Sequence, residues 1–190
     1  MSRVLVLGCP GAGKTTLAIE LARRTGLPVI HLDTHYWRAG WVEPTRDEWR
    51  AQVATLLART SWVMEGNYGS TIADRLSCAD TAIVLDFPTW RCLWRVVKRI
   101  ALSYGRTRPD LAEGCPEHID FPFLLYVLRF RRRSRPRHEA ALAGFSGRVV
   151  RLNAPGQVRR YLATLPSPQL PPGSRPDQEP VQIVQDRAVV

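Results

Sequence analysis

Residues 8–15 read Gly-Cys-Pro-Gly-Ala-Gly-Lys-Thr, which is the G-x-x-x-x-G-K-T pattern of a phosphate-binding loop. Residues 4–7, directly before it, form a continuous apolar run typical of a parallel strand that is buried on both faces. After it, Leu17 and Leu21 recur at helical spacing. A helix that begins at Lys14 would turn its unpaired amides and its positive dipole end towards a phosphate. The context therefore predicts a strand–loop–helix unit that binds a nucleoside triphosphate.

The residue types in this loop suit phosphate binding. Its glycines permit positive φ and a close approach of the backbone, Lys14 can reach the β and γ phosphates, and the Thr15 hydroxyl can ligate magnesium. The chain lacks the Asn-Lys-x-Asp sequence of guanine-reading switches, so we expect ATP with Mg²⁺ as the ligand. The predicted nucleotide-binding residues are Gly8, Pro10, Gly11, Ala12, Gly13, Lys14, Thr15 and Thr16.

A chain of 190 residues is long enough for one α/β domain with its own core, which we place at residues 1–165. Residues 166–190 contain six prolines, which neither a helix nor a central strand accommodates, and are predicted to form a disordered tail.

No run approaches the roughly 20 apolar residues of a membrane span, and the N-terminus begins directly with strand residues. We therefore expect a cytoplasmic protein without a membrane partner, whose four cysteines are free thiols.

Strand and helix signals alternate along the chain, which predicts a doubly wound parallel sheet. The expected strands are residues 3–7, 28–32, 61–65, 81–86 and 148–152. Thr45 and Glu48 form a capping box for a helix that runs to about residue 59, and residues 89–104 form a basic amphipathic helix. Glycine and proline interrupt the periodicity over residues 105–120, which predicts an irregular excursion over the site.

Three carboxylates follow predicted strands, at the edge of the sheet where parallel α/β proteins bind ligands. Asp33, Glu65 and Asp86 occupy these positions. Beside a phosphate loop, such groups can hold magnesium through water or accept a proton from an attacking hydroxyl. We favour these roles for Asp33 and Glu65, whereas for Asp86 capping of the next turn is an equal alternative.

Histidine, tryptophan and cysteine residues near these strand ends can be interpreted either as structural or as ligand-binding side chains. His31 and His35 flank Asp33 and fit satisfied core side chains better than metal ligands. Trp37 and Trp41 either form an aromatic wall for a ring-bearing substrate or cover the adjacent helix. The Cys-Pro-Glu-His run at residues 115–118 resembles half of a zinc site, but the sequence offers no second half.

The formal net charge is +10, and only Lys14 and Lys98 are lysines. A basic surface attracts polyanions, whereas phosphotransfer enzymes also use arginines because a guanidinium meets phosphate oxygens bidentately. The densest basic run is predicted to be either a solvated helix face or a phosphate contact. It comprises Arg129, Arg131, Arg132, Arg133, Arg135 and Arg137.

Several separate motifs together resemble the topology-modulation (FlaR-like) proteins, bacterial members of the adenylate-kinase-like group of phosphate-loop kinases. The resemblance covers most of residues 3–163 and leaves out the tail. It implies a three-layer α/β fold with strand order 2-3-1-4-5, a substrate-binding helical section at about residues 34–60, and a mobile lid at about residues 105–137. The motifs that carry it are residues 8–15, 31–33 with Trp37 and Trp41, 65–68, 85–88, 106–110 and 114–117.

The resemblance also implies roles for individual residues. Arg95 and Arg99 match two arginines, four apart, that serve the nucleotide in the helix entering the lid, and Arg106 and Arg108 lie in the lid. The loop containing Asn153 and Pro155 resembles the one that covers adenine. Glu65 occupies the position of an aspartate near magnesium.

The chain departs from adenylate kinases after this acidic residue. Their Gly-Phe-Pro-Arg sequence, whose arginine grips the monophosphate, is replaced by Gly-Asn-Tyr-Gly at residues 66–69, and Arg75 is a candidate substitute.

We expect transfer of the ATP γ-phosphoryl group to a small acceptor, a nucleotide or a hydroxylated metabolite. Asp33 would orient or deprotonate the acceptor, with Trp37, Asn67 and Tyr68 contacting it. The rival is a nucleotide-dependent nucleic-acid-binding protein that affects DNA topology.

Overall fold

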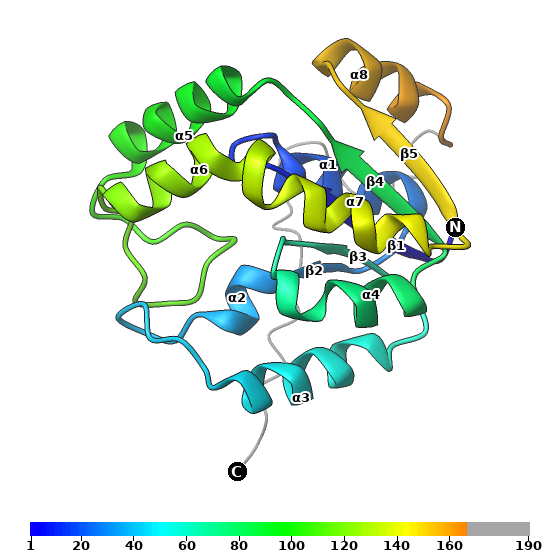
Figure 1. The fold of residues 1–190 in the computed structure, drawn as a ribbon, viewed down its shortest axis with the longest axis horizontal. Helices are drawn as coiled ribbons and strands as arrows, with labels where there is room; N and C mark the ends of the chain where they lie inside the picture. Colours follow the sequence, from blue (N-terminus) through cyan, green and yellow to red (C-terminus); the bar gives the residue numbers. More distant parts are fainter. Residues whose placement is uncertain (167–190) are drawn as a thin grey trace, which may run out of the picture.

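A computed structural model describes residues 1–166 of the chain. Its five strands form one parallel sheet in the order β2-β3-β1-β4-β5, which confirms the predicted fold class and strand order (Figure 1). Each predicted strand is present to within one residue at either end. The strands are β1 (Arg3–Gly8), β2 (Val29–His31), β3 (Trp62–Glu65), β4 (Thr81–Leu85) and β5 (Arg148–Leu152).

Helices connect the strands. The predicted capping box is present, because the Thr45 hydroxyl accepts from the Glu48 amide and the Glu48 carboxylate accepts from the Thr45 amide. The prediction also holds for the first helix, which begins at Lys14. The helices are α1 (Lys14–Thr25), α2 (Leu32–Tyr36), α3 (Arg46–Leu57), the 3₁₀ turn η1 (Gly69–Thr71), α4 (Ile72–Cys78), α5 (Thr89–Ser103), α6 (Phe121–Arg133), α7 (Arg135–Ala143) and α8 (Pro155–Ala163).

The sheet is covered on both faces, which gives three layers. Alternate residues of β1 point to opposite faces: Val4 and Val6 pack with side chains of α1, α5 and α8, whereas Leu5 and Leu7 pack with α3, α4 and α7. All four side chains are fully buried, and each contributes about 1.5–3 kcal/mol by leaving water. This burial explains why the sequence of β1 is apolar without alternation.

Two helices that the periodicity did not resolve, α6 and α7, follow the irregular segment at residues 104–120. Helix α6 packs against α5, and its Val127 and Phe130 join the core beneath the phosphate loop. The carboxylate of Asp120 caps α6 by accepting from the Phe123 amide at 3.2 Å. The segment expected to be a lid therefore comprises an irregular stretch and a helix that is anchored to the core.

None of the helices within residues 1–166 has the length and hydrophobicity needed for a membrane span. The predicted disordered tail lies outside the described residues, apart from Pro166.

Candidate functional site

The phosphate loop connects the carboxyl end of β1 to the N-terminus of α1, and its backbone admits only glycine at two points. Gly8 has φ +149°, and a Cβ there would lie 2.6 Å from the Leu85 carbonyl oxygen. Gly11 has φ +80°, and a Cβ there would collide with the Cys92 carbonyl oxygen. Because the loop lies directly against β4 and α5, its glycines permit this packing as well as the approach of a phosphate.

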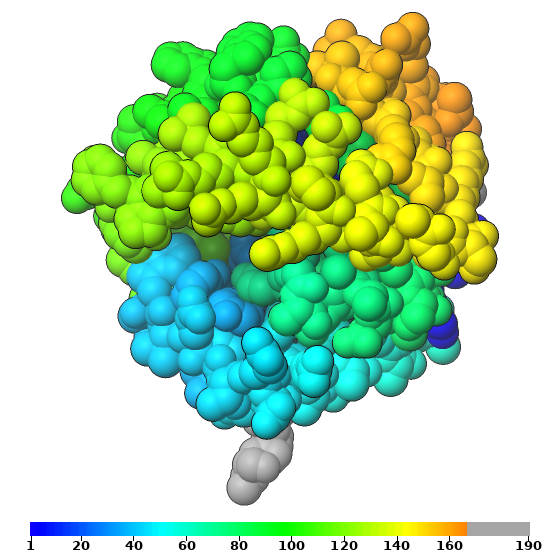
Figure 2. Space-filling view, in the orientation of Figure 1, coloured from blue at the N-terminus to red at the C-terminus, as the bar shows by residue number. Residues whose placement is uncertain are grey.

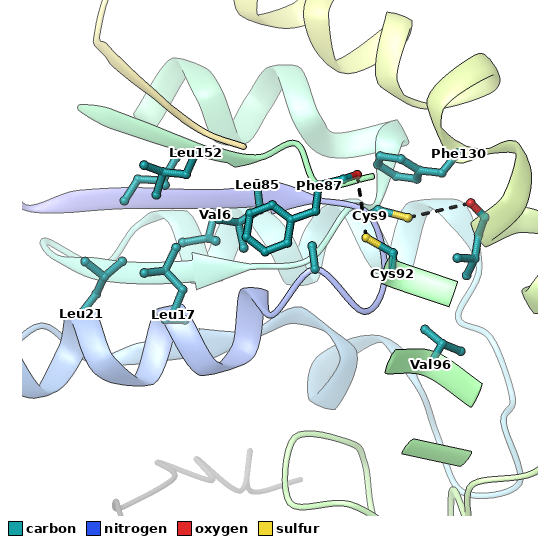
Figure 3. Close-up of a cluster of buried hydrophobic side chains, with 14 of the residues drawn as sticks. Val6, Cys9, Leu17, Leu21, Leu85, Phe87, Cys92, Val96, Phe130 and Leu152 are labelled. Atoms are coloured by element: carbon teal, nitrogen blue, oxygen red, sulfur yellow. Dashed lines mark hydrogen bonds between the residues drawn. The ribbon is translucent and has the colours of Figure 1, made fainter. Parts of the chain in front are cut away.

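A buried cluster supports the loop from below (Figure 3). It contains two thiols in contact, Cys9 of the loop and Cys92 of α5, and Figure 3 shows their sulfur atoms beside Phe87 and Phe130. The Cys92 contact, followed by burial, raises the pKa of Cys9, so this group stays protonated. All four cysteines are free, as predicted, and these two act as small apolar side chains that fix the loop to α5.

A cavity of about 730 Å³ opens beside the loop. Figure 2 shows the molecule hollowed between the segment around α2 and helix α6, where this cavity reaches the surface. Its walls come from the phosphate loop, α2, the loop after β3, the irregular segment and α6. The predicted site residues that line it are Pro10, Gly11, Lys14, Thr15, Asp33, Trp37, Glu65, Asn67, Tyr68, Arg99 and Arg108.

Oxygen ligands suitable for a hard cation meet at the first turn of α1. The Thr15 hydroxyl lies 3.1 Å from Glu65 Oε1 and 3.3 Å from Asp110 Oδ2, and His31 Nδ1 lies 3.0 Å from the same Glu65 oxygen. Burial acts to raise the pKa of Glu65, but the His31 hydrogen bond and the charge of Lys14 outweigh it and lower that pKa. Glu65 therefore remains a carboxylate in a buried position.

These donors fit magnesium, which binds through one or two carboxylates together with substrate phosphates. A dedicated cage of three or more His, Cys, Asp or Glu side chains is absent from residues 1–166. The Cys-Pro-Glu-His run forms no such cage: the Cys115 thiol donates to the Arg38 carbonyl at 3.2 Å, and His118 packs edge-on against Trp41.

Asp33 and Tyr68 both line the cavity and are hydrogen-bonded to each other. The Tyr68 hydroxyl donates to Asp33 Oδ1 at 2.6 Å. Burial raises the pKa of Asp33, and the nearby charge of Glu65 adds to the increase. Two carboxylates thus sit close together with pKa values displaced in opposite directions, the arrangement expected when one group stays charged and another exchanges a proton. Asn67 Oδ1 accepts from the Gly8 amide at 3.4 Å, which links this loop to the phosphate loop.

Arg75 is a buried residue whose role the sequence did not reveal. Its guanidinium is fully buried and donates to the carbonyls of Gly66, Asn67 and Tyr68 at 2.9, 2.6 and 2.8 Å, and to that of Thr71 at 3.3 Å. The hypothesis that Arg75 grips the acceptor is therefore wrong, because all three nitrogens are used by backbone. Arg75 instead fixes the loop that presents Asn67 and Tyr68.

Two of the four predicted lid and α5 arginines line the cavity. Arg99 Nε and Arg108 Nε lie 3.0 and 2.8 Å from Glu117 Oε1, and Arg108 Nη1 lies 3.2 Å from Asp110 Oδ2. Burial, followed by the neighbouring Arg108, lowers the pKa of Arg99. Asp110 and Glu117 were not predicted as site residues, although both fall in the run of motifs that carries the family resemblance.

The other two arginines lie elsewhere. Arg95 lies over the Phe87 ring and donates to the Ala12 carbonyl of the phosphate loop at 3.4 Å. Arg106 is exposed and absent from the cavity walls. Asn153, between β5 and α8, and Pro155, the first residue of α8, were predicted to cover adenine and do not line the cavity.

The basic run of α6 and α7 divides into two groups. Arg131 and Arg135 lie 3.7 and 2.8 Å from the carboxylate of Asp86, so this aspartate ties the two helices to the end of β4. Asp86 is not part of the cavity. The remaining four arginines of the run are exposed: Arg129, Arg132, Arg133 and Arg137.

The aromatic residues after β2 form one wall of the cavity. Trp37 packs edge-on against Tyr36 and Trp41, with ring centroids 5.0 and 5.2 Å apart, and all three line the space. This arrangement favours the aromatic-wall interpretation of Trp37 and Trp41. His31 is buried and hydrogen-bonded to Glu65, as expected of a satisfied core histidine.

Comparisons with known proteins agree with this fold. The isopentenyl transferase family model matches residues 1–36, which hold β1, the phosphate loop, α1 and β2. Shikimate kinase from Bacteroides thetaiotaomicron is 14% identical, with a TM-score of 0.52 over 85% of this chain and 94% of that one. Shikimate kinase from Acinetobacter baumannii in complex with shikimate is 17% identical, with a TM-score of 0.51 over 86% and 90%. Curated protein sequences give no significant match. The chain therefore has a phosphate-loop kinase fold.

Proposed function

We propose that this protein is a phosphotransferase that moves the γ-phosphoryl group of ATP to a hydroxyl group of a small acceptor. One observation carries the proposal: a single cavity is lined both by the phosphate loop, with Lys14 and Thr15, and by Asp33, whose carboxylate accepts a hydrogen bond from Tyr68. Phosphoryl transfer requires this combination, because the enzyme mainly positions the two substrates and stabilises charge.

The loop and α1 would hold the triphosphate. The loop amides and the N-terminal dipole of α1 attract the β and γ phosphates, and Lys14 adds a full positive charge. Magnesium would be held at Thr15 and Glu65, where it would neutralise charge on the phosphates.

The acceptor would meet Asp33. In the proposed step, the acceptor oxygen forms a bond to the γ-phosphorus, the bond to the bridging oxygen of ATP breaks, ADP leaves, and the hydroxyl proton passes to the Asp33 carboxylate. The Tyr68 hydroxyl holds that carboxylate in place at 2.6 Å. Asn67, which also lines the cavity, would hydrogen-bond the acceptor.

Arginines would offset the charge that spreads over the transferring group. Arg99 and Arg108 are paired with Glu117 in this structure, and both line the same cavity as Lys14. Bidentate contacts to phosphate oxygens would replace part of this pairing. Arg95 would act on the loop backbone through Ala12, whereas Arg106 would reach the nucleotide only after the irregular segment moves.

Kinship with the topology-modulation (FlaR-like) proteins and a cytoplasmic location are part of the same proposal. The order of the motifs, the strand order and the position of Glu65 support the kinship.

The experiment is ADP release from Mg-ATP with a panel of acceptors, comparing the wild type with Lys14→Ala. We expect acceptor-dependent release that falls at least 100-fold in the variant, because the lysine charge acts on the transferring phosphate. The matched control is Lys98→Ala, which removes the other lysine, an exposed residue on α5. Equal turnover by wild type and Lys14→Ala would rule out chemistry at this loop.

The rival function, nucleotide-dependent binding of nucleic acid, would use the four exposed arginines of α6 and α7. It is tested with labelled duplex DNA at rising salt, where binding through phosphates weakens steeply. ADP release that responds only to DNA would favour the rival, whereas release that responds to a small acceptor favours the kinase.

A further inference from the structure

We propose that Asp110 is a further ligand of the magnesium ion, supplied by the irregular segment at residues 104–120. This inference rests on the proposed phosphotransferase function and adds a residue that makes the segment respond to the Mg-ATP complex and not to ATP alone. Three observations support it: the oxygens around the Thr15 hydroxyl, the ion pairs of Arg108, and the backbone contacts that hold the segment in place.

Two carboxylates from different parts of the chain approach the Thr15 hydroxyl. Glu65 Oε1, at the end of β3, lies 3.1 Å from Thr15 Oγ1, and Asp110 Oδ2, in the irregular segment, lies 3.3 Å from it. A hydroxyl carries one proton, so it donates to one of these oxygens at a time. The other carboxylate then faces the Thr15 oxygen without a hydrogen between them. A cation shared by the three oxygens removes this conflict.

The spacing of these oxygens suits magnesium. Neighbouring oxygens around an octahedral Mg²⁺ lie about 2.9 Å apart, because the metal–oxygen distances are about 2.0–2.1 Å. The two distances to Thr15 Oγ1, 3.1 and 3.3 Å, are close to that value. Magnesium is usually bound by one or two carboxylates together with substrate phosphates, and Glu65, Asp110 and a triphosphate on the loop make up such a set.

Arg108, two residues before Asp110, has partners that a nucleotide can replace. Its Nη1 lies 3.2 Å from Asp110 Oδ2, and its Nε lies 2.8 Å from Glu117 Oε1. The Nε contact lacks hydrogen-bond geometry, and within the described residues neither of its two buried atoms has another hydrogen-bond partner. A phosphate oxygen would give this guanidinium a charge-assisted hydrogen bond and release Asp110 to the metal.

The ion pair of Arg108 and Asp110 makes the segment selective for the complete Mg-ATP complex. Mg-ATP brings phosphate oxygens for the arginine and a cation for the aspartate, so both members gain a partner of opposite charge. ATP without metal would satisfy Arg108 but leave the Asp110 carboxylate near phosphates of like charge. The affinity for ATP should therefore depend on Mg²⁺ through Asp110.

Backbone contacts fix the segment in this position. The Gly105 amide donates to the Glu117 carbonyl at 2.8 Å, which closes the base of the segment between α5 and α6. The Gly40 amide donates to the Gly114 carbonyl at 2.9 Å, which ties the segment to the chain after α2, as the ribbon shows (Figure 1). The position of Asp110 thus depends on the fold of its segment as well as on its ion pair.

The test is calorimetric titration of ATP into full-length wild type and Asp110→Asn, each in excess Mg²⁺ and in EDTA. Asparagine keeps the size of the side chain and removes its charge. We expect the variant to bind Mg-ATP about 10-fold or more weakly than wild type, and to bind metal-free ATP at least as tightly. The matched control is Glu113→Gln, an exposed acid of the same segment outside the cavity, which should behave as wild type.

Two results of this titration would overturn the inference. One is an equal dependence on Mg²⁺ in Asp110→Asn and wild type. The other is an equal loss of affinity with and without Mg²⁺, which would indicate that Asp110 only supports the structure.

A change of metal preference gives a readout that loss of folding does not imitate. Asp110→Cys replaces a hard oxygen ligand by a soft thiolate, which favours Cd²⁺ over Mg²⁺. We expect the ratio of the ATP affinities with Cd²⁺ and with Mg²⁺ to be about 10-fold or more higher in this variant than in wild type and in the control Glu113→Cys. An unchanged ratio in Asp110→Cys would contradict ligation at this position.

The outcomes distinguish this inference from the proposed function. Lys14-dependent binding of ATP with an unchanged response to Mg²⁺ in Asp110→Asn would overturn the role of Asp110 and leave the nucleotide site in place. Equal binding of ATP by wild type and Lys14→Ala would instead overturn the proposed function.

Discussion

Replacement of Arg75 by methionine should have two effects. It should destabilise the protein, and it should weaken binding of the acceptor. Methionine keeps the apolar stem and removes the donors that hold the carbonyls of Gly66, Asn67 and Tyr68. Three hydrogen bonds from a charged donor give roughly 5–9 kcal/mol at about 1.5–3 kcal/mol each. Burial of the charged guanidinium offsets part of this stabilisation. It lowers the pKa of Arg75 to about 10, a shift that corresponds to about 3 kcal/mol of destabilisation of the charged form.

The net loss expected for Arg75→Met is therefore about 2–6 kcal/mol, and its midpoint of about 4 kcal/mol lowers Tm by about 12 °C for a domain of this size. The assay is thermal unfolding followed by circular dichroism, with urea unfolding as a second measure. Arg137→Met is the matched control, since Arg137 is an exposed arginine on α7. Among molecules that remain folded, KM for the acceptor should rise more than KM for ATP. A Tm within about 3 °C of the control variant would refute the role assigned to Arg75.

Three further predictions concern other parts of the structure. Gly11→Ala should abolish measurable ATP binding in calorimetry, because Gly11 has φ +80° and an added Cβ would collide with the Cys92 carbonyl. The control variant Gly144→Ala should bind ATP normally, because a Cβ at Gly144 meets nothing within 4 Å. Tyr68→Phe should lower kcat about 10-fold by freeing Asp33, with ATP affinity unchanged; an unaltered kcat would exclude this positioning role. His138 has its pKa lowered to about 4 by burial, so the unfolded state binds the proton first and stability falls as pH drops from about 6.5 to 4, by up to about 3 kcal/mol. His138→Leu should flatten that part of a stability–pH curve, and an identical slope would contradict it.

The fold was predictable from the sequence because its strongest signals are local. Apolar residues 4–7, the glycine-rich loop and the helical spacing after Lys14 each dictate their own element, and together they define a strand–loop–helix unit. The strand order came from the family resemblance, since periodicity alone does not say which strands are neighbours. Helices α6 and α7 were not resolved. In α6, Leu125 and Leu128 are exposed whereas Val127 and Phe130 are buried, so its apolar residues do not follow a clear helical period.

The site was predictable where a side chain follows a strand. Asp33, Glu65 and Tyr68 stand next to β2 and β3, so the topology brings them to the phosphate loop. Asp110 and Glu117 lie in an irregular segment with no periodicity, and their positions depend on tertiary contacts. Arg75 was misjudged because an arginine bound to backbone carbonyls has the same sequence signature as an exposed one.

The central claim is that phosphate passes from ATP to an organic hydroxyl at Asp33. The most direct measurement is a single-turnover reaction with ATP labelled at the γ-phosphate, comparing wild type with Asp33→Asn after equal ATP binding by both proteins has been verified. The account predicts label in an organic phosphate ester with wild type and at least 100-fold slower transfer with the variant. Label that appears solely as inorganic phosphate, or that reaches the ester equally fast with Asp33→Asn, would contradict it.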